Sequence, residues 1–319
     1  MFDVQPEMMA KAKGRGLKCY AAASELLSDH DVDIVVIATP NDVHKEYAIA
    51  ALRAGKAVVC EKPVTMNAGE LEEIIAVAEE TGRLFAVHQN RRWDRDFRII
   101  KAILDEGNLG KPYFIESRVQ GSRKAMHGWR GYKVNGGGMV LDWGIHLLDQ
   151  VMWMVKSPVV QVNSHLLSVF TPEVEDNIKI FLRFENGISA LLEMSTNCLI
   201  NNPRWHVSCE GGTVVVDGWG CEGKIVKLKP DGDLQWTEDI VYTEAGPTRT
   251  MAPRPLHTMQ EEALPTIDTA WTDYYENIVD VLDGKAELVV TPQQALRVMK
   301  VIDSVFEANE NGIGIKCRI

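Results

Sequence analysis

The chain has 319 residues, of which 45% are hydrophobic and 25% are charged, and its formal net charge at pH 7 is −11. The length and composition are typical of a soluble globular protein with two domains, and the acidic balance argues against nucleic acid or an anionic membrane as a partner. The six cysteines form no Cys-x-x-Cys pair and no zinc-like cluster with histidine, so we expect reduced thiols, a cytoplasmic location and no metal site.

The start of the chain predicts the end of a strand at residues 2–4, followed by helices over residues 6–13 and 22–27. In a dinucleotide-binding sheet, a glycine-rich phosphate turn lies about 20 residues before an acidic residue that binds the adenine ribose. If Asp3 is that residue, the turn would lie upstream of Met1, because the glycines at 136–138 lack a strand-to-helix context. One hypothesis is therefore that about 25–30 further residues precede Met1 in the working protein.

Residues 31–65 predict a β-α-β unit. The apolar runs at residues 34–38 and 57–60 are typical of strands that are buried on both faces. A turn at residues 39–42 and a helix that ends at Gly55 connect them. The two strands should therefore be parallel and joined by a right-handed crossover.

Polar side chains follow both strands of this unit. Thr39, Asn41 and His44 come after the first strand, and Glu61 and Lys62 come after the second. Open parallel sheets bind ligands at the carboxyl ends of their strands. The sequence therefore predicts a ligand site at this edge of the sheet.

The remaining elements indicate two domains, which we place at residues 1–115 (dinucleotide-binding) and 116–319 (substrate binding and oligomerisation). Asn186-Gly187 and Gly211-Gly212 separate short alternating runs in the manner of hairpins. The predicted fold is α/β: a Rossmann-type parallel sheet, N-terminally incomplete, and a C-terminal α+β domain with a largely antiparallel open sheet. Helices are predicted over residues 68–81, 96–106, 271–282 and 293–309, strands over 84–87, 113–119, 159–170, 177–184, 188–196, 205–210 and 213–216, and a long arm or loop over 228–268.

A second informative segment begins at the three glycines 136–138 and continues into a predicted helix. On an α-helix, Asp142, His146 and Asp149 would share one face. A carboxylate beside an imidazole fixes its tautomer and prepares it as a general base. An alternative is a buried Asp–His pair that only ties the helix to its neighbours.

Three motifs occur in order: Ile37-Ala-Thr-Pro-Asn-x-x-His44, Glu61-Lys62-Pro63, and Gly136-Gly-Gly followed by Asp142-Trp-Gly-x-His146. Together they resemble the glucose–fructose oxidoreductase/inositol dehydrogenase/MocA family, over essentially the whole chain. The resemblance implies a Rossmann domain, a C-terminal domain with an open sheet, NAD or NADP as cofactor, and a homodimer or homotetramer formed through the C-terminal sheet. Asn90 to Asp94 resembles the branch that acts on inositols and related sugars.

The resemblance also implies catalytic roles. Lys62 would hydrogen-bond the reacting hydroxyl, His146 would take its proton, and Asp142 would orient His146 or bind a substrate hydroxyl. Arg91 would contact the substrate together with these three residues. Trp143 is placed in the core, with stacking on a sugar ring as the alternative. Hydride transfer needs no metal when a cation and a base share the developing alkoxide.

Cofactor contacts are implied at the strand ends and in a Trp-Arg pair. A carboxylate that binds the ribose repels a 2′-phosphate, so Asp3 favours NAD over NADP. His44 has an alternative as a helix N-terminal residue without a ligand. The implied cofactor-binding residues are Asp3, Thr39, Pro40, Asn41, His44, Glu61, Lys62, Gln89, Trp129 and Arg130.

Two functions follow as hypotheses. The first is an NAD(P)-dependent oxidoreductase that moves hydride between nicotinamide and a secondary alcohol of a cyclic polyol, sugar or sugar acid. The alternative is a non-catalytic sugar- or nucleotide-binding, regulatory member of the same fold, which lacks the phosphate-binding turn.

Overall fold

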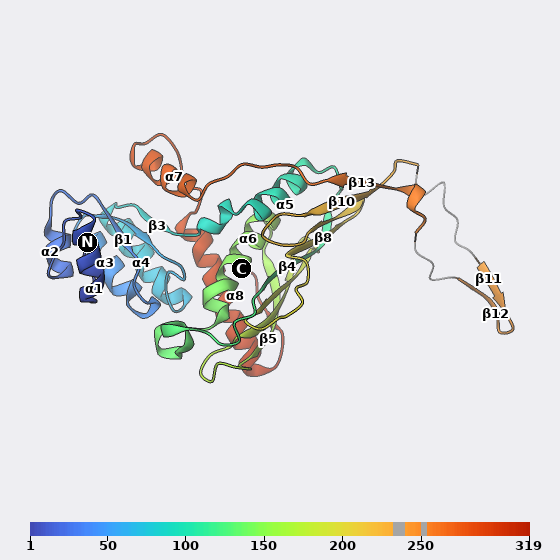
Figure 1. The fold of residues 1–319 in the computed structure, drawn as a ribbon, viewed down its shortest axis with the longest axis horizontal. Coiled ribbons are helices and arrows are strands. Elements are labelled where there is room, and N and C mark those ends of the chain that lie inside the picture. Colours follow the sequence, from blue (N-terminus) through green and yellow to red (C-terminus); the bar gives the residue numbers. More distant parts are fainter. Residues whose placement is uncertain (232–239, 250–253) are drawn as a thin grey trace.

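The computed structural model describes residues 1–231, 240–249 and 254–319. Two main sheets lie toward opposite ends of an elongated molecule, with helices between them (Figure 1). The first is a three-stranded sheet in the order β1-β2-β3, and the second has nine strands. The predicted fold class, a parallel sheet followed by a large, mostly antiparallel sheet, is confirmed.

The small sheet is parallel throughout, as the β-α-β pattern predicts. Its strands carry short, β-branched, apolar runs, and its helices present apolar residues at helical spacing to them. Asn67 caps the helix after the second strand by accepting a hydrogen bond from the Glu70 backbone. The elements are α1 (Pro6–Gly14), α2 (Ala23–Ser28), β1 (Ile34–Ile37), α3 (His44–Arg53), β2 (Ala57–Cys60), α4 (Ala68–Thr81) and β3 (Phe85–Val87).

Strand β1 differs from the prediction of burial on both faces. It is an edge strand of the described sheet, and the Val36 side chain is 49% exposed. Residues 2–4 are not a strand, although the Met1 carbonyl accepts a hydrogen bond from the Tyr20 backbone. A short apolar run identifies a strand but not its neighbours in the sheet. An edge strand and a central strand can therefore have the same sequence pattern.

The large sheet has the order β13-β10-β9-β8-β4-β7-β6-β5-β14, and every pairing is antiparallel except β4 with β7. Its first strand begins at Pro112, so the boundary that we expect after residue 115 falls inside a strand. The strands are β4 (Pro112–Gln120), β5 (Val159–Leu167), β6 (Asn177–Phe184), β7 (Ser189–Ser195), β8 (Trp205–Cys209), β9 (Gly212–Val216), β10 (Gly223–Leu228), β13 (Met259–Ala263) and β14 (Ile315–Lys316).

The segment expected to be an irregular arm, residues 228–268, contains regular structure. Strand β13 pairs with β10 and extends the large sheet, and β11 (Ile240–Thr243) forms a hairpin with β12 (Gly246–Arg249) that projects from the body (Figure 1). The single turn η6 (Leu256–Thr258) precedes β13. Residues 232–239 and 250–253 of the expected arm lie outside the described residues.

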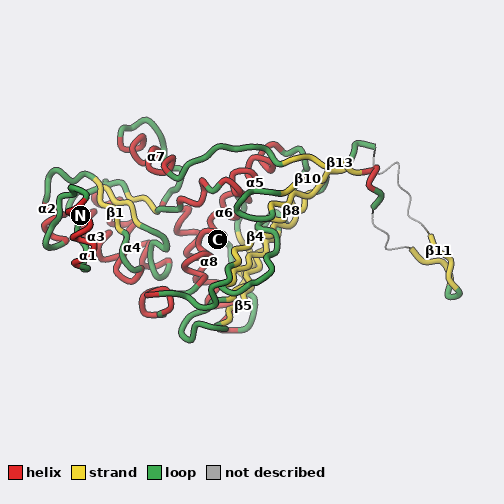
Figure 2. The backbone as a smooth tube through the Cα atoms, viewed as in Figure 1, coloured by secondary structure: helices red, strands yellow, loops and turns green. Residues whose placement is uncertain are grey.

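A layer of helices lies between the two sheets (Figure 2). It consists mainly of α6 (Ile145–Val155) and α8 (Pro292–Asn311), and α8 also packs against α4 of the small sheet. Helix α5 (Arg95–Glu106) follows the small sheet. Helix α7 (Thr272–Leu282) comes from near the end of the chain and returns to lie beside the small sheet (Figure 1). No helix in the described part of the chain is long and apolar enough to cross a bilayer.

A buried ion pair joins the two parts of the molecule. Arg92 lies in the short η2 turn (Asn90–Trp93) after β3, and its guanidinium donates two hydrogen bonds of 2.7 Å to Asp149 on α6. The same guanidinium donates to the Val289 carbonyl at 2.7 Å and to Gln294 on α8 at 2.8 Å. Both members of the pair are about 1–2% exposed. Such a bidentate, fully bonded pair fixes the geometry of the elements that carry it.

We expect Arg92→Met to lower the free energy of unfolding by about 3–5 kcal/mol, because Asp149 would remain buried without its counter-ion. Urea denaturation followed by circular dichroism measures this change. As a control, Arg318→Met breaks the exposed pair with Glu185 and should leave the unfolding midpoint unchanged. Equal effects of the two substitutions would contradict the role assigned to Arg92.

Candidate active site

The carboxyl ends of the three small-sheet strands form one rim, and the polar residues predicted from the sequence lie along it. Thr39 follows β1, Lys62 follows β2, and Gln89 follows β3. The C-terminal part supplies Asp142 and His146 to the same place. The expectation that these residues converge rests on the parallel order of the strands, which the structure contains.

Lys62 and Asp142 meet directly. The Lys62 ammonium donates a hydrogen bond of 2.8 Å to the Asp142 main-chain carbonyl and one of 3.1 Å to its carboxylate. The same carboxylate oxygen accepts a hydrogen bond of 3.2 Å from Arg130 Nε. Burial lowers the pKa of Lys62, while the Asp142 charge opposes that shift. The ammonium is therefore held at the rim by one carboxylate shared between two cations.

Residues Val140–Gly144 form a π-helical turn that leads directly into α6. A π-turn contains one residue more than an α-helical turn, so it rotates the preceding residues relative to the following helix. Asp142 lies in this π-turn, whereas His146 and Asp149 lie in α6. Asp142 bonds Lys62, and Asp149 pairs with Arg92. The placement of the three side chains on one face stays a prediction.

His146 is oriented by Gln89 in place of Asp142. Its Nδ1 lies 3.0 Å from the Gln89 side-chain oxygen, which can only accept, so Nδ1 carries the proton. Nε2 then has a free lone pair. His146 is 3% exposed, and neutral imidazole with a fixed tautomer is the form that acts as a base.

The charges around His146 favour its neutral form. Burial lowers the pKa of His146 well below its ordinary value, and the nearby positive charges of Lys62 and Arg91 lower it further. Smaller contributions of the same sign come from His88 and Arg204.

The three glycines 136–138 bring a loop of the C-terminal part against the small sheet. The Gly136 carbonyl accepts a hydrogen bond of 2.8 Å from the buried Asn41 side chain. A Cβ on Gly137 would lie 2.3 Å from the Arg130 carbonyl oxygen, so a larger residue would push the loop apart. This close packing holds Trp129 and Arg130 near the rim, where the Arg130 guanidinium lies 4.4 Å from the Trp129 ring.

The rim residues fit the nicotinamide end of a dinucleotide. Thr39 Oγ1 and Gln89 Nε2 are buried and have no hydrogen-bond partner among the residues that the structure describes. Buried polar atoms without partners are rare and costly, and both atoms lie at strand ends that bind such cofactors in parallel sheets. Together with Asn41 and Pro40, which form the turn after β1, they would hold the group.

Other predicted cofactor residues occupy different environments. His44 is fully buried, and its two ring nitrogens lie 2.9 Å from the carbonyls of Thr39 and Pro63, so it fixes the turn and presents no free nitrogen. Glu61 accepts a hydrogen bond of 2.7 Å from His88. Burial alone would raise the pKa of Glu61, but His88 and Lys62 together more than offset it, so the pKa of Glu61 is lowered. Asp3 is half-buried and accepts from the Gln5 backbone at 2.8 Å.

Arg91 is connected to His146 through the ring of Trp143. Its guanidinium stacks on the Trp143 ring at 4.3 Å, and that ring lies 5.8 Å from the His146 ring. Trp143 is half-buried, whereas we expect it to be buried in the core. Arg91 therefore reaches the predicted substrate side of the site, while its neighbour Arg92 serves the ion pair.

Two features of the structure were not predicted from the sequence. Tyr274, at the start of α7, packs edge-on against His88 at 4.6 Å and comes from a distant part of the chain. Residues 218–223 match Gly-x-Gly-x-x-Gly by letter, but they connect antiparallel strands β9 and β10, so they are not a phosphate turn. No group of three or more metal-ligating side chains occurs among the described residues.

We expect Gln89→Glu to raise the pKa of His146, because a carboxylate at Nδ1 stabilises the imidazolium. A reaction in which His146 accepts a proton needs the neutral imidazole, so the acidic limb of the pH–rate profile should move to higher pH. Steady-state rates across pH measure the shift. Gln161→Glu adds the same charge on β5, near the sheet edge, and should leave the limb in place; a wild-type limb in Gln89→Glu would contradict the Gln89–His146 contact.

Both parts of the chain match models of known protein families. Residues 2–89 match the model of an oxidoreductase family with an NAD-binding Rossmann fold (GFO/IDH/MocA), and residues 97–215 match the model of a GFO/IDH/MocA C-terminal domain. The structure of an NAD-binding protein from Listeria innocua superposes with a TM-score of 0.93 at 41% identity, covering 99% of this chain and 90% of that chain.

Curated relatives match over most of their length. The oxidoreductase YdgJ of Escherichia coli K12 is 30% identical over 310 residues, which is 95% of this chain and 86% of YdgJ. The scyllo-inositol 2-dehydrogenase (NADP(+)) IolW of Bacillus subtilis is 27% identical over 291 residues, which is 90% of this chain and 79% of IolW.

Proposed function

Because the chain belongs to the GFO/IDH/MocA family of oxidoreductases with an NAD-binding Rossmann fold, we propose that it oxidises a secondary alcohol of a cyclic polyol, sugar or sugar acid, or reduces the corresponding ketone, with a nicotinamide cofactor. The proposal is supported by the contacts of two residues: Lys62 follows β2 and bonds the turn that leads into α6, and His146 on α6 lies 3.0 Å from Gln89, which follows the neighbouring strand β3. The names of relatives, an inositol dehydrogenase and a 1,5-anhydro-D-fructose reductase, support the substrate class.

A bound nicotinamide supplies the hydride acceptor or donor. In the oxidation direction, His146 Nε2 takes the proton of the substrate hydroxyl. The Lys62 ammonium donates a hydrogen bond to the same oxygen and stabilises the developing alkoxide. Asp142 holds Lys62 in place, and Gln89 keeps the proton of His146 on Nδ1. In the reduction direction the same groups return the proton.

We also propose that the protein acts in the cytoplasm and assembles as a homodimer or homotetramer through the large sheet. All six cysteines are free, which suits a reducing compartment. The open face of the sheet carries a network of ion pairs, in which Arg118 contacts Glu116 and Glu193, and Glu193 contacts Lys179. Such a charged face is suited to a polar, self-complementary interface, and sedimentation equilibrium measures the assembly state.

Lys62→Met and His146→Ala should each lower kcat by about 10²- to 10⁴-fold, the usual contribution of a positioned acid or base. The assay follows nicotinamide absorbance with inositols and aldoses as substrates, and circular dichroism verifies the fold of each variant. Lys45→Met, which removes an exposed lysine paired with Glu73, serves as the control and should keep the wild-type rate.

The outcomes separate the two functional hypotheses. A normal rate in either variant would exclude the assigned roles. Binding of NADH or NADPH without turnover of any polyol or sugar would favour the non-catalytic, regulatory alternative.

We expect tighter binding of NADH than of NADPH if Asp3 contacts the adenine ribose, since its carboxylate repels a 2′-phosphate. Fluorescence titration of the reduced cofactors measures both affinities. Asp3→Ser should narrow the difference by weakening NADH and strengthening NADPH binding, whereas Asp29→Ser removes an acid that is bonded to Lys18 and Tyr20 and should not alter the preference. An unchanged preference in Asp3→Ser would reject Asp3 as the ribose ligand.

A further inference from the structure

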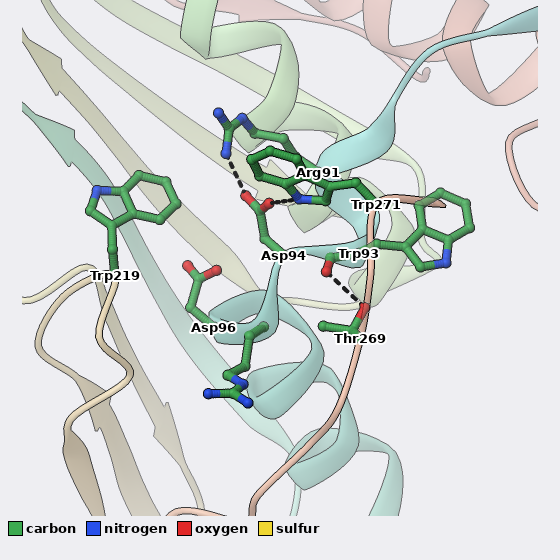
Figure 3. Close-up of a pocket in the computed structure, with 8 residues that line it drawn as sticks. Arg91, Trp93, Asp94, Asp96, Trp219, Thr269 and Trp271 are labelled. Atoms are coloured by element: carbon green, nitrogen blue, oxygen red, sulfur yellow. Dashed lines mark hydrogen bonds and ion pairs between the residues drawn. The ribbon is translucent and has the colours of Figure 1, made fainter. Parts of the chain in front are cut away.

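A second hollow lies beside the candidate active site, with a volume of about 280 Å³ (Figure 3). Three separate segments form it. Trp219 comes from the β9–β10 connection, Trp271 from the residue before α7, and Asp94 and Asp96 from the chain after β3. Figure 3 shows the two indoles on either side of the hollow with the carboxylates between them.

Arg91 connects this hollow to the reacting groups. Its guanidinium carbon lies 5.5 Å from the Trp219 ring and 5.6 Å from the Trp271 ring, and it also stacks on Trp143. The Trp143 ring in turn lies 5.7 Å from Trp219 and 5.8 Å from His146. Trp143 therefore contacts both a wall of the hollow and the ring of the candidate base, so the two sites are neighbours.

The walls of the hollow are fixed before any ligand binds. Asp94 accepts a hydrogen bond of 3.0 Å from the Trp271 indole N–H through one oxygen, and one of 3.0 Å from Arg91 through the other. Thr269 donates to the Trp93 carbonyl at 2.8 Å and anchors the segment that carries Trp271. Preorganised walls of this kind lower the entropic cost of binding.

The surface chemistry of the hollow is that of a carbohydrate site. Trp219 and Trp271 are 51% and 57% exposed, an unusual state for the largest apolar side chain. Flat indole faces pack well against the C–H face of a sugar ring, and carboxylates and guanidinium groups bond its hydroxyls. Ligand pockets combine aromatic walls with a few fixed polar groups in this manner.

The charges of the hollow balance, which favours a neutral ligand. Arg91 pairs with Asp94, and Asp96 pairs with the buried Arg204 at 3.0 Å. Arg95, which also lines the hollow, pairs with Asp268 at 3.6 Å, so each of these three cations has a carboxylate partner. The volume is at the small end of ligand pockets, which span about 300–1,000 Å³, so the hollow suits one ring and not a long chain.

We propose that this hollow binds the second sugar unit of a neutral glycoside whose first ring reacts between Lys62 and His146. The inference rests on the proposed function for the reacting ring. It makes a disaccharide or other glycoside, and not a free monosaccharide or inositol, the preferred substrate, with Trp219 and Trp271 as the residues that determine this specificity.

The test is isothermal titration calorimetry of the full chain with the common glucose, galactose and mannose disaccharides and with the matching monosaccharides. At least one disaccharide should bind about tenfold or more tightly than its component monosaccharides, as expected for one additional stacked ring. Trp219→Ala should remove that advantage and leave the monosaccharide affinity unchanged. Trp271→Phe, which keeps a ring but loses the hydrogen bond to Asp94, should remove part of the disaccharide advantage.

The matched control is Tyr242→Ala, which removes another exposed aromatic residue, on the β11–β12 hairpin, and should retain the full disaccharide preference. Equal binding of disaccharides and monosaccharides, no binding of any disaccharide, or an unchanged preference in Trp219→Ala would each overturn the proposal.

Turnover distinguishes the failure of this inference from the failure of the proposed function. Turnover of monosaccharides that is lost in Lys62→Met, with no disaccharide preference, rejects the second subsite alone. Disaccharide binding that depends on Trp219, with no nicotinamide-dependent turnover, keeps the subsite and rejects the dehydrogenase. If both hold, Trp219→Ala should raise KM for the disaccharide about tenfold at nearly constant kcat.

Discussion

The buried Arg92–Asp149 pair is the contact on which the geometry of the site depends. It joins η2, the turn after β3, to α6, and the same two segments carry the Gln89–His146 hydrogen bond. Gln150, the next residue on α6, donates to the Arg91 carbonyl at 2.7 Å and adds a third link. These four hydrogen bonds between two short segments fix the imidazole relative to the strand ends. An imidazole placed only by packing would have freedom to rotate, which a general base in hydride transfer cannot have.

The electrostatics of the rim follow from sharing one acid between two cations. The Asp142 carboxylate accepts hydrogen bonds from Lys62 and Arg130, whereas His146 is bonded to the neutral side-chain amide of Gln89. A carboxylate in place of that amide would raise the pKa of His146. Burial and the nearby cations instead lower the pKa of His146 and favour the neutral imidazole, which can accept a proton. Two residues thus serve two roles: Asp142 holds the cation, and Gln89 orients the base without adding charge.

Much of the rim could be predicted from the sequence, because the relevant rules are local. The β-α-β pattern places Thr39, Lys62 and Gln89 at strand ends, and parallel strands bring those ends together. The π-turn could not be predicted, since the residues of Val140–Gly144 suit an α-helix equally well.

The exposed state of β1 and the extension of the large sheet by β10 and β13 also escaped prediction. Pairing between strands separated by a long connection depends on tertiary packing and not on the pattern of either strand. The same limit applies to Trp219 and Trp271, which are single aromatic residues in loops when only the sequence is considered. Only the structure shows that both line one hollow together with Asp94, which bonds Trp271.

The return of the chain from β13 to α7 explains how one segment serves both sides of the site. It delivers Trp271 to the carboxylate of Asp94 on the substrate side, and a few residues later it delivers Tyr274 to His88 on the cofactor side. His88 in turn bonds Glu61, which precedes Lys62. The segment that carries Trp271 therefore also contacts the residues around Lys62, the candidate catalytic lysine. Because η2 lies between these contacts and is held by the Arg92–Asp149 pair, the aromatic hollow and the reacting groups are parts of a single, rigidly supported binding surface.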